Sequence, residues 1–162
     1  MILAIDIGNT NITFGLFKGS RLMEKAQVLT SAIVKYGSFM RKLKHRRGDS
    51  IKAIAVCSVV PKAEKALVKA LKKSLSVRIF ILGKDIKVPI KNLYKNPKQV
   101  GQDRLVAAYA AYSLYGGDKP IVVIDFGTAV TFDVVSKKGA YLGGLIFPGM
   151  EMSLDALSEK AA

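Results

Sequence analysis

Short apolar runs separated by polar turns predict a β-meander at the start of the chain. Residues 2–5 and 12–17 are apolar, and residues 8–11 between them are the turn formers Gly, Asn, Thr and Asn. Residues 21–29 can form a third antiparallel strand after a second turn. We therefore expect a strand, a tight turn and a strand, with the carboxylate of Asp6 at the end of the first strand.

From residue 31 onward the pattern changes to helices that alternate with β-branched runs. A helix is expected over residues 31–44, with Ser31 as its cap. The β-branched run at 51–60 predicts a buried parallel strand, residues 61–75 a helix that begins with proline, and residues 77–82 another strand. The helix 61–75 places apolar side chains on one face and lysines opposite. Those apolar residues are Ala63, Ala66, Leu67, Ala70 and Leu71.

A long polar loop at residues 83–100 precedes an apolar helix at 105–115. Loops of this length in compact domains usually carry function. The helix is apolar on nearly every side, which fits either a core helix or one packed against a partner subunit. We place the domain boundary after the loop, giving an N-terminal lobe at 1–100 and a linking helix with the start of a second lobe at 101–162.

The strand and turn at the start of the chain return in the second half. Residues 121–124 are apolar and end in Asp125, and Gly127 follows two positions on, as Gly8 follows Asp6. With one residue dropped in the second turn, Thr128, Thr131 and Phe132 fall opposite Thr10, Thr13 and Phe14. The pattern indicates a duplication with one acidic turn in each half.

The last part of the chain predicts two more strands and a helix. The strands cover residues 130–136 and 140–147, and the helix covers 151–162. Gly143 and Gly144, and then Pro148 and Gly149, are expected to break the second strand.

The pair of acidic turns suggests phosphate binding. Turns rich in Gly, Asn and Thr bring backbone N–H groups and side-chain donors close to an anion. A carboxylate repels phosphate, so Asp6 and Asp125 make sense beside a nucleotide only with a cation between, such as Mg²⁺. The alternative for each turn alone is an ordinary turn with a capping acid.

Asp103 and Arg104 stand at the start of the apolar helix. Asp103 is either a helix cap or a general base between a substrate hydroxyl and the phosphate turns. Arg104 could hold a substrate carboxylate by a bidentate pair. Either role gains weight from the two turns.

Composition and charge limit the other classes. The chain has 162 residues, half of them apolar, and a net charge of +14. The lysines are spread along the chain, and the basic cluster at 41–47, which includes His45, fits a solvated helix end better than a nucleic-acid contact. Cys57 lies in an apolar run and should be a buried thiol. With no disulfide, no span for a membrane and no leader before the first strand, we expect a cytoplasmic protein.

Four motifs in order resemble type III pantothenate kinases of the actin/hexokinase/Hsp70-like superfamily. They are DIGNTN at 6–11, NLYKNPKQVGQDR at 92–104, DFGTAVTFD at 125–133 and GGLIFPG at 143–149. The resemblance covers the whole chain. It implies an α/β fold of the ribonuclease H-like (actin-like ATPase) kind, with duplicated lobes, mixed sheets and flanking helices.

The resemblance also implies a reaction and a set of site residues. The reaction is ATP-dependent phosphorylation of pantothenate, the first step towards coenzyme A, in a homodimer with Mg²⁺. Asp125 would face a monovalent cation, K⁺ or NH₄⁺, and Asp103 would be the base. The ATP phosphates would be held by Asp6, Ile7, Gly8, Asn9, Thr10, Asn11, Ile12, Thr13 and Thr128. The pantothenate site would be lined by Tyr94, Gly101, Gln102, Asp103 and Arg104.

One departure and two rival interpretations remain. Family members continue for roughly another half-length, so we expect a second lobe that is incomplete here, and the activity of the 162-residue chain itself stays open. One rival is a non-catalytic relative that acts as a transcriptional accessory factor, which the basic surface favours and the intact acidic residues oppose. The other is a kinase of the same superfamily with a different acceptor.

Overall fold

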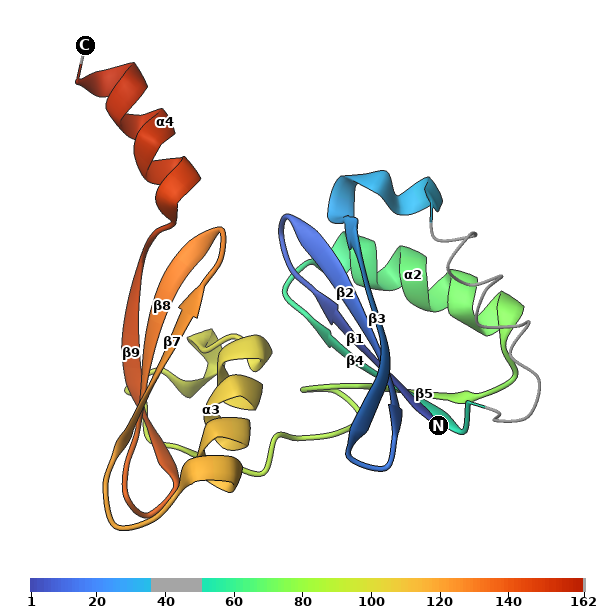
Figure 1. The fold of residues 1–162 in the computed structure, drawn as a ribbon, viewed down its shortest axis with the longest axis horizontal. Helices are drawn as coiled ribbons and strands as arrows, with labels where there is room; N and C mark the ends of the chain where they lie inside the picture. Colours follow the sequence, from blue (N-terminus) through green and yellow to red (C-terminus); the bar gives the residue numbers. More distant parts are fainter. Residues whose placement is uncertain (36–50, 162) are drawn as a thin grey trace. The chain divides into compact units, whose positions relative to one another are not determined.

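The computed structural model describes residues 1–35 and 51–161 (Figure 1). The chain divides into two compact units, Met1–Lys87 and Val88–Ala162, which are described separately. The segment from Val88 to Val100, which we expected to close the first lobe, packs with the second unit, because Val88, Ile90 and Val100 join its core.

The first unit is a five-stranded mixed sheet with strand order β3-β2-β1-β4-β5. The meander expected at the N-terminus is present, with β1 antiparallel to β2 and β2 antiparallel to β3. The expected parallel strand is also present, since β4 runs parallel to both β1 and β5. The strands are β1 Ile2–Ile7, β2 Asn11–Lys18, β3 Arg21–Leu29, β4 Ala53–Ser58 and β5 Arg78–Ile81.

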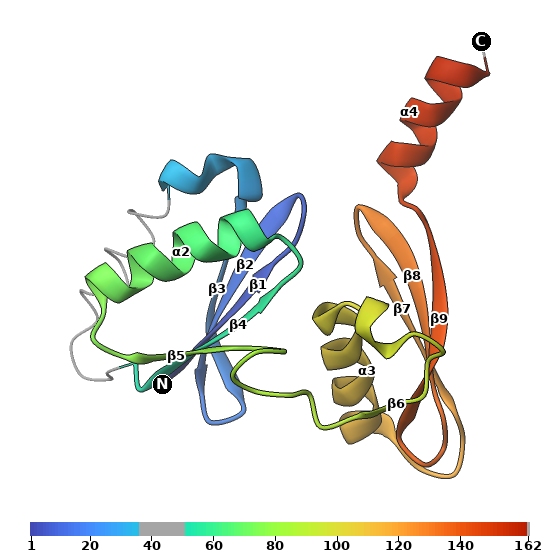
Figure 2. The same cartoon turned by 180° about the vertical axis from the view of Figure 1, so that it is seen from behind.

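Helix α2, Pro61–Ser74, covers one face of this sheet (Figure 2). Alternate residues of β1, β2 and β4 point into a shared core with Ala63, Leu67 and Leu71 of the helix. The prediction for this helix face was partly wrong, because Ala66 and Ala70 are exposed. The buried stripe follows the strict i, i+4 spacing of 63, 67 and 71, which leaves the two other alanines on its flank. The buried apolar side chains of the core are Leu3, Ile5, Ile7, Ile12, Phe14, Leu16, Ile54, Val56, Ala63, Leu67 and Leu71.

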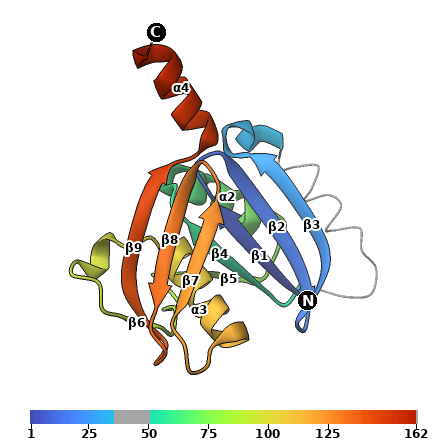
Figure 3. The ribbon, with the colours of Figure 1, turned by 60° about the vertical axis from the view of Figure 1, so that its left-hand side comes forward.

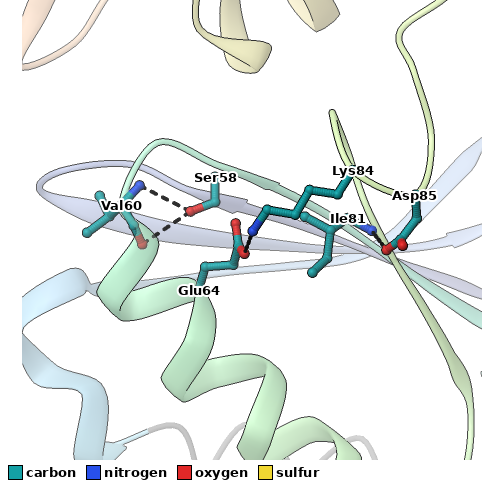
Figure 4. Close-up of polar contacts among 6 residues, drawn as sticks. All are labelled: Ser58, Val60, Glu64, Ile81, Lys84 and Asp85. Carbon is teal, nitrogen blue, oxygen red and sulfur yellow. Dashed lines mark hydrogen bonds and ion pairs between the residues drawn. The ribbon is translucent and has the colours of Figure 1, made fainter.

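One ion pair fastens the first turn of α2 to the segment after β5 (Figure 4). Glu64, whose side chain is 12% exposed, accepts from the Lys84 ammonium group at 2.5 Å. The Asp85 carboxylate accepts from the N–H of Ile81 at 2.8 Å and closes the turn that follows β5. Neither Glu64 nor Lys84 is a candidate site residue.

The described part of the helix expected over 31–44 is a short 3₁₀ helix, η1, Thr30–Lys35. The basic cluster at 41–47, with His45, lies outside the described residues. Cys57 is buried, as its apolar surroundings predicted.

The second unit is a four-stranded sheet with strand order β6-β9-β8-β7. Helix α3, Gln102–Tyr115, packs on β7 and β8. A small core forms between them from Val100, Leu105, Ala108, Val135 and Tyr141. The strands are β6 Lys91–Asn92, β7 Ile121–Phe126, β8 Ala129–Val135 and β9 Ala140–Pro148, and a short 3₁₀ helix, η2, spans Pro97–Gln99.

One prediction for this unit needs correction. Strand β9 is continuous through Gly143 and Gly144, because the ladder absorbs them with a shift of register between Val134 and Val135. Helix α3 is not covered on all sides within the unit, since Leu114 and Tyr115 are 73% and 79% exposed. Of the two alternatives for this helix, packing against a partner subunit stays a prediction.

Helix α4, Met150–Lys160, continues from the end of β9 (Figure 3). Its apolar residues Leu154 and Leu157 are both 60% exposed. None of the helices among the described residues is both long enough and apolar enough to span a membrane.

Candidate active site

The first acidic turn joins β1 to β2. Asp6 lies directly opposite Thr13 in the ladder, and its side chain is exposed on the face away from the α2 core. The N–H of Gly8 donates to the carbonyl of Asn11 at 2.9 Å, which closes the turn. The Thr30 hydroxyl donates to the carbonyl of Gly8 at 2.7 Å, so the segment after β3 supports the turn from outside.

The second acidic turn, between β7 and β8, repeats this arrangement. Asp125 lies opposite Thr131, and Ile124 lies opposite Phe132, as Ile5 lies opposite Phe14 in the first hairpin. The N–H of Gly127 donates to the carbonyl of Ala129 at 3.1 Å, one residue sooner than in the first turn. The duplication predicted with one residue dropped is therefore confirmed in the register of the two ladders.

The duplication also relates the two faces of the sheets. In β1 the alternate residues Leu3, Ile5 and Ile7 are buried beneath α2. Their counterparts in β7 are Val122, Ile124 and Phe126, whose side chains are 56%, 48% and 79% exposed. The second sheet thus presents an apolar face where the first sheet is covered.

The sequence-predicted phosphate ligands are of two kinds. Ile7 and Ile12 pair with each other at the end of the hairpin and are fully buried, so only their backbone can contact a ligand. Asn9 and Thr10 are exposed at the tip, where their polar side chains can reach an anion. Thr128, in the second turn, is likewise exposed, and its carbonyl accepts from the N–H of Gly149 at 3.0 Å.

Each acidic turn by itself carries oxygen donors that suit a hard cation. In the described residues no three His, Cys, Asp or Glu side chains gather as a metal cage. Asp6 and Asp125 each offer one exposed carboxylate beside a threonine. Mg²⁺ is commonly bound by one or two carboxylates together with substrate phosphates, so these residues fit it.

Asp103 lies in the first turn of α3 with its side chain exposed. The cap of the helix is Gly101, so the interpretation of Asp103 as the capping residue is wrong. Its Oδ1 accepts the backbone N–H of Arg104 at 2.8 Å. The carboxylate therefore remains accessible to a ligand at a defined place, and negative charge is favoured at a helix N-terminus.

Arg104 turns inward from the same helix turn and pairs with Asp133 of β8. Its Nε donates to Asp133 Oδ1 at 2.9 Å, and its Nη2 lies 2.7 Å from the same oxygen. The side chains are 14% and 2% exposed. Burial acts against the charge of Arg104, but the hydrogen bond and attraction from Asp133 outweigh it and raise the pKa of the guanidinium.

Tyr141 of β9 completes the cluster. Its hydroxyl donates to Asp133 Oδ1 at 2.6 Å. Burial, and then the hydrogen bond to Asp133, raise the pKa of the Tyr141 phenol well above its ordinary value. Oδ1 of the buried Asp133 carboxylate thus accepts from two side chains on two different elements.

Two glycines of β9 make room for the cluster. A Cβ on Gly144 would lie 2.6 Å from Arg104 Nη2 and 1.9 Å from the carbonyl oxygen of Phe132. Gly143 has φ +127°, and a Cβ there would lie 2.9 Å from the ring of Tyr94. The Tyr94 ring therefore packs against Gly143, and the Arg104 guanidinium packs against the next residue of the strand, Gly144.

The structure brings the expected acceptor-binding residues together in the second unit. Tyr94 is 37% exposed, Gly101 and Gln102 are half-buried, and Asp103 is exposed beside Arg104. Sequence reasoning missed Asp133 and Tyr141 as members of the cluster. Asp133 could have been found as an acid inside the otherwise apolar strand that ends the motif DFGTAVTFD, because a buried charge needs a partner.

The comparisons with solved structures define the fold class. An ethanolamine utilization protein from Carboxydothermus hydrogenoformans matches 98% of this chain and 56% of its own, with a TM-score of 0.56 and 16% identity. A candidate 2-dehydro-3-deoxygalactonokinase from Sinorhizobium meliloti matches 98% and 59%, with a TM-score of 0.58 and 14% identity. The fold is that of the actin-like ATPases and sugar kinases, as the motifs predicted.

The comparisons of sequence define the family. The sequence model of type III pantothenate kinase matches residues 2–162. Type III pantothenate kinases from Moorella thermoacetica and Myxococcus xanthus are 41% and 44% identical over 168 residues. The chain belongs to the type III pantothenate kinase family. It spans 65% of the length of these two relatives, which match all of it.

Proposed function

We propose that this protein transfers the terminal phosphoryl group of ATP to the primary hydroxyl of pantothenate, giving 4'-phosphopantothenate. Family membership supports the reaction. The observation that carries the assignment is the geometry at the start of α3, where an accessible Asp103 stands beside an Arg104 that is already fixed by Asp133. An accessible carboxylate and a fixed cation side by side suit an acceptor that carries both a hydroxyl and an anionic group.

Asp103 is the proposed general base. Its carboxylate would accept a hydrogen bond from the primary hydroxyl, orient it and take its proton as the bond to phosphorus forms. Tyr94, Gly101, Gln102 and Arg104 would bind the rest of the acceptor. Arg104 is the proposed partner for the pantothenate carboxylate, because a guanidinium binds carboxylates with a fixed planar geometry.

The two acidic turns are the proposed phosphate-binding elements. The N–H groups of Gly8 and Gly127 close their own turns, so other donors of residues 6–13 and Thr128 would contact the phosphate oxygens. Asp6 would hold Mg²⁺, and Asp125 would face a monovalent cation, K⁺ or NH₄⁺. These cations would neutralise phosphate charge, and the chain itself supplies alignment and a base.

We further propose a homodimer in the cytoplasm. The exposed outer face of α3 supports the dimer, since Tyr109, Leu114 and Tyr115 are 38%, 73% and 79% exposed. Aromatic side chains of this kind are enriched in interfaces. Sedimentation of Leu114→Glu beside the unaltered protein tests it: the variant should be monomeric, and a variant that sediments like the parent contradicts the proposal.

The function is tested by a coupled assay for ADP release with ATP, MgCl₂, KCl and pantothenate. Turnover should require each of the four components. Removing pantothenate tests the acceptor, and a panel of sugars and hydroxy acids tests rival kinases of the same fold. Turnover with a panel member but not with pantothenate would overturn the assignment.

A further inference from the structure

Asp133 is a carboxylate buried to 2% exposure at the centre of the second unit. Burying a charged group is costly unless it is paired and hydrogen-bonded. Its Oδ1 meets that need with the Nε of Arg104 at 2.9 Å and the hydroxyl of Tyr141 at 2.6 Å. The hydroxyl of Thr131, two residues earlier on β8, lies 3.5 Å from Oδ2.

The same contacts remove the freedom of the Arg104 side chain. An arginine normally has many rotamers, and holding it in one is entropically costly. Here two guanidinium nitrogens converge on one oxygen of Asp133. The backbone of Gly144 lies against Nη2, at a distance that excludes even a methyl group. The guanidinium is therefore set before any ligand arrives.

One donor of this guanidinium is left over. Nη2 is within ion-pair distance of Asp133, yet it is buried and makes no hydrogen bond of good geometry in the part of the chain that the structure describes. A buried donor without a hydrogen bond is unfavourable and is rare in native structures, so this one calls for a partner or a functional role. The neighbouring Tyr94 and Asp103 are both exposed, so the cluster borders an accessible surface.

We infer that Asp133 is a positioning residue for Arg104 in the acceptor site, with Tyr141 as its support. This inference rests on the proposed function. Asp133 fixes the guanidinium by Nε and leaves an unused N–H for the acceptor's carboxylate. Tyr141 keeps Asp133 in place, because its phenol remains a protonated donor. Asp133 itself does not contact the substrate.

The simpler alternative is that the cluster only joins α3 to the sheet. Both readings predict that Asp133→Asn lowers stability, so stability alone cannot separate them. Glu64→Gln provides the control, because it removes a carboxylate that is 12% exposed and ion-paired with Lys84 in the first unit (Figure 4). Tyr141→Phe is the milder second variant, since it removes one hydroxyl and keeps the ring.

The first measurement follows the Arg104 side chain directly by NMR of its Nε–H, assigned with Arg104→Lys. The protein should show a protected and rigid Nε–H signal that Asp133→Asn loses and Glu64→Gln retains. This readout is independent of activity. A signal that is unchanged in Asp133→Asn overturns the inference, even if the protein turns out to phosphorylate pantothenate.

The second measurement separates KM from kcat. Asp133→Asn should raise the KM for pantothenate about tenfold or more, as expected for a hydrogen bond to a charged group, and change kcat less. Tyr141→Phe should raise the same KM by a smaller factor, and the KM for ATP should be unchanged in both. Pantothenyl alcohol, which lacks the carboxylate, should show the same KM with the unaltered protein and with Asp133→Asn. If the KM of Asp133→Asn for pantothenate is no higher than that of Glu64→Gln, the inference is overturned.

Chemical rescue gives the final discrimination. Guanidinium ions should restore part of the turnover of Arg104→Ala, because Asp133 remains to bind them. They should fail with the double variant Arg104→Ala/Asp133→Asn, and equal rescue of both contradicts the inference. If the unaltered protein does not phosphorylate pantothenate, the proposed function fails, whereas the NMR comparison still decides whether Asp133 holds Arg104.

Discussion

Asp6 and Thr13 lie directly opposite each other on neighbouring strands, and Asp125 and Thr131 repeat that relationship in the second unit. A carboxylate and a hydroxyl at the same point of two duplicated hairpins are hard to explain by packing, because Asp6 and Asp125 are both exposed. We propose that these two carboxylates serve a ligand. The first prediction follows from this pair.

Asp6→Asn should reduce turnover about a hundredfold or more, because it removes a charge that the proposed Mg²⁺ requires. Its effect on the free energy of unfolding should be within about 0.5 kcal/mol, as is usual for surface substitutions. Kinetics at several MgCl₂ concentrations and urea unfolding measure the two effects. Asp118→Asn, an exposed acid in the loop before β7, is the control and should leave both quantities unchanged. Full activity of Asp6→Asn would exclude its role.

Asp103→Asn should lower kcat by about 10²–10⁴-fold, the usual contribution of a general base. The carboxylate is exposed, so the fold should be preserved. Single-turnover experiments measure the loss of rate, and a near-normal circular dichroism spectrum would show that the fold is preserved. Unchanged kcat would remove Asp103 from the proposed mechanism.

Gly149→Ala should destabilise the second unit by about 1–3 kcal/mol, the usual cost of overpacking. A Cβ at Gly149 would lie 2.4 Å from the carbonyl oxygen of Gly127 and 2.5 Å from that of Thr128. Gly117→Ala is the matched control, since nothing lies within 4 Å of its added methyl group. Urea unfolding of both variants measures the difference. Equal midpoints would mean that the turn relaxes without cost.

The stability of the protein should fall at alkaline pH in a way that depends on Tyr141. Its pKa is raised in the folded state, whereas an unfolded tyrosine ionises near about pH 10. Above that pH the unfolded chain binds fewer protons than the native state, so the free energy of unfolding decreases as pH rises. Below it the contribution is fully present.

Thermal unfolding between about pH 9 and 11.5 measures this decrease. Tyr141→Phe should be less stable at neutral pH and should lose less stability over the alkaline range. Identical slopes for the two proteins would contradict the raised pKa.

Most of the fold follows from local patterns. The strand at 21–29 was predicted with its observed bounds, and the helix that begins at Pro61 ends one residue earlier than expected. Proline at a helix start and alternating side chains in strands are short-range signals, so no knowledge of the tertiary structure is needed. The duplication was also visible in the sequence, because the matching residues keep the same spacing in both halves. The two ladders have the corresponding register.

The candidate site was only partly predictable for a physical reason. Asp103 and Arg104 are neighbours in the sequence, but the side chain of Asp103 is exposed and that of Arg104 is largely covered. The pattern of residues did not distinguish them. The partner of Arg104 is Asp133 of β8, which in turn accepts from Tyr141 of β9, and both lie far along the chain. Gly143 was interpreted as a strand breaker because glycine weakens a strand interior. Here the strand continues with a shift of register, and Gly143 adopts a positive φ.

The way in which each acidic hairpin closes on itself has a consequence for nucleotide affinity. The N–H groups of Gly8 and Gly127 each close their own loop by a hydrogen bond, and Thr30, just after β3, donates to the carbonyl of Gly8. A loop that is already ordered loses little conformational entropy when a ligand binds. The affinity for a triphosphate tail should therefore depend mainly on charge and on the salt concentration, with only a small change in heat capacity from ordering of the chain.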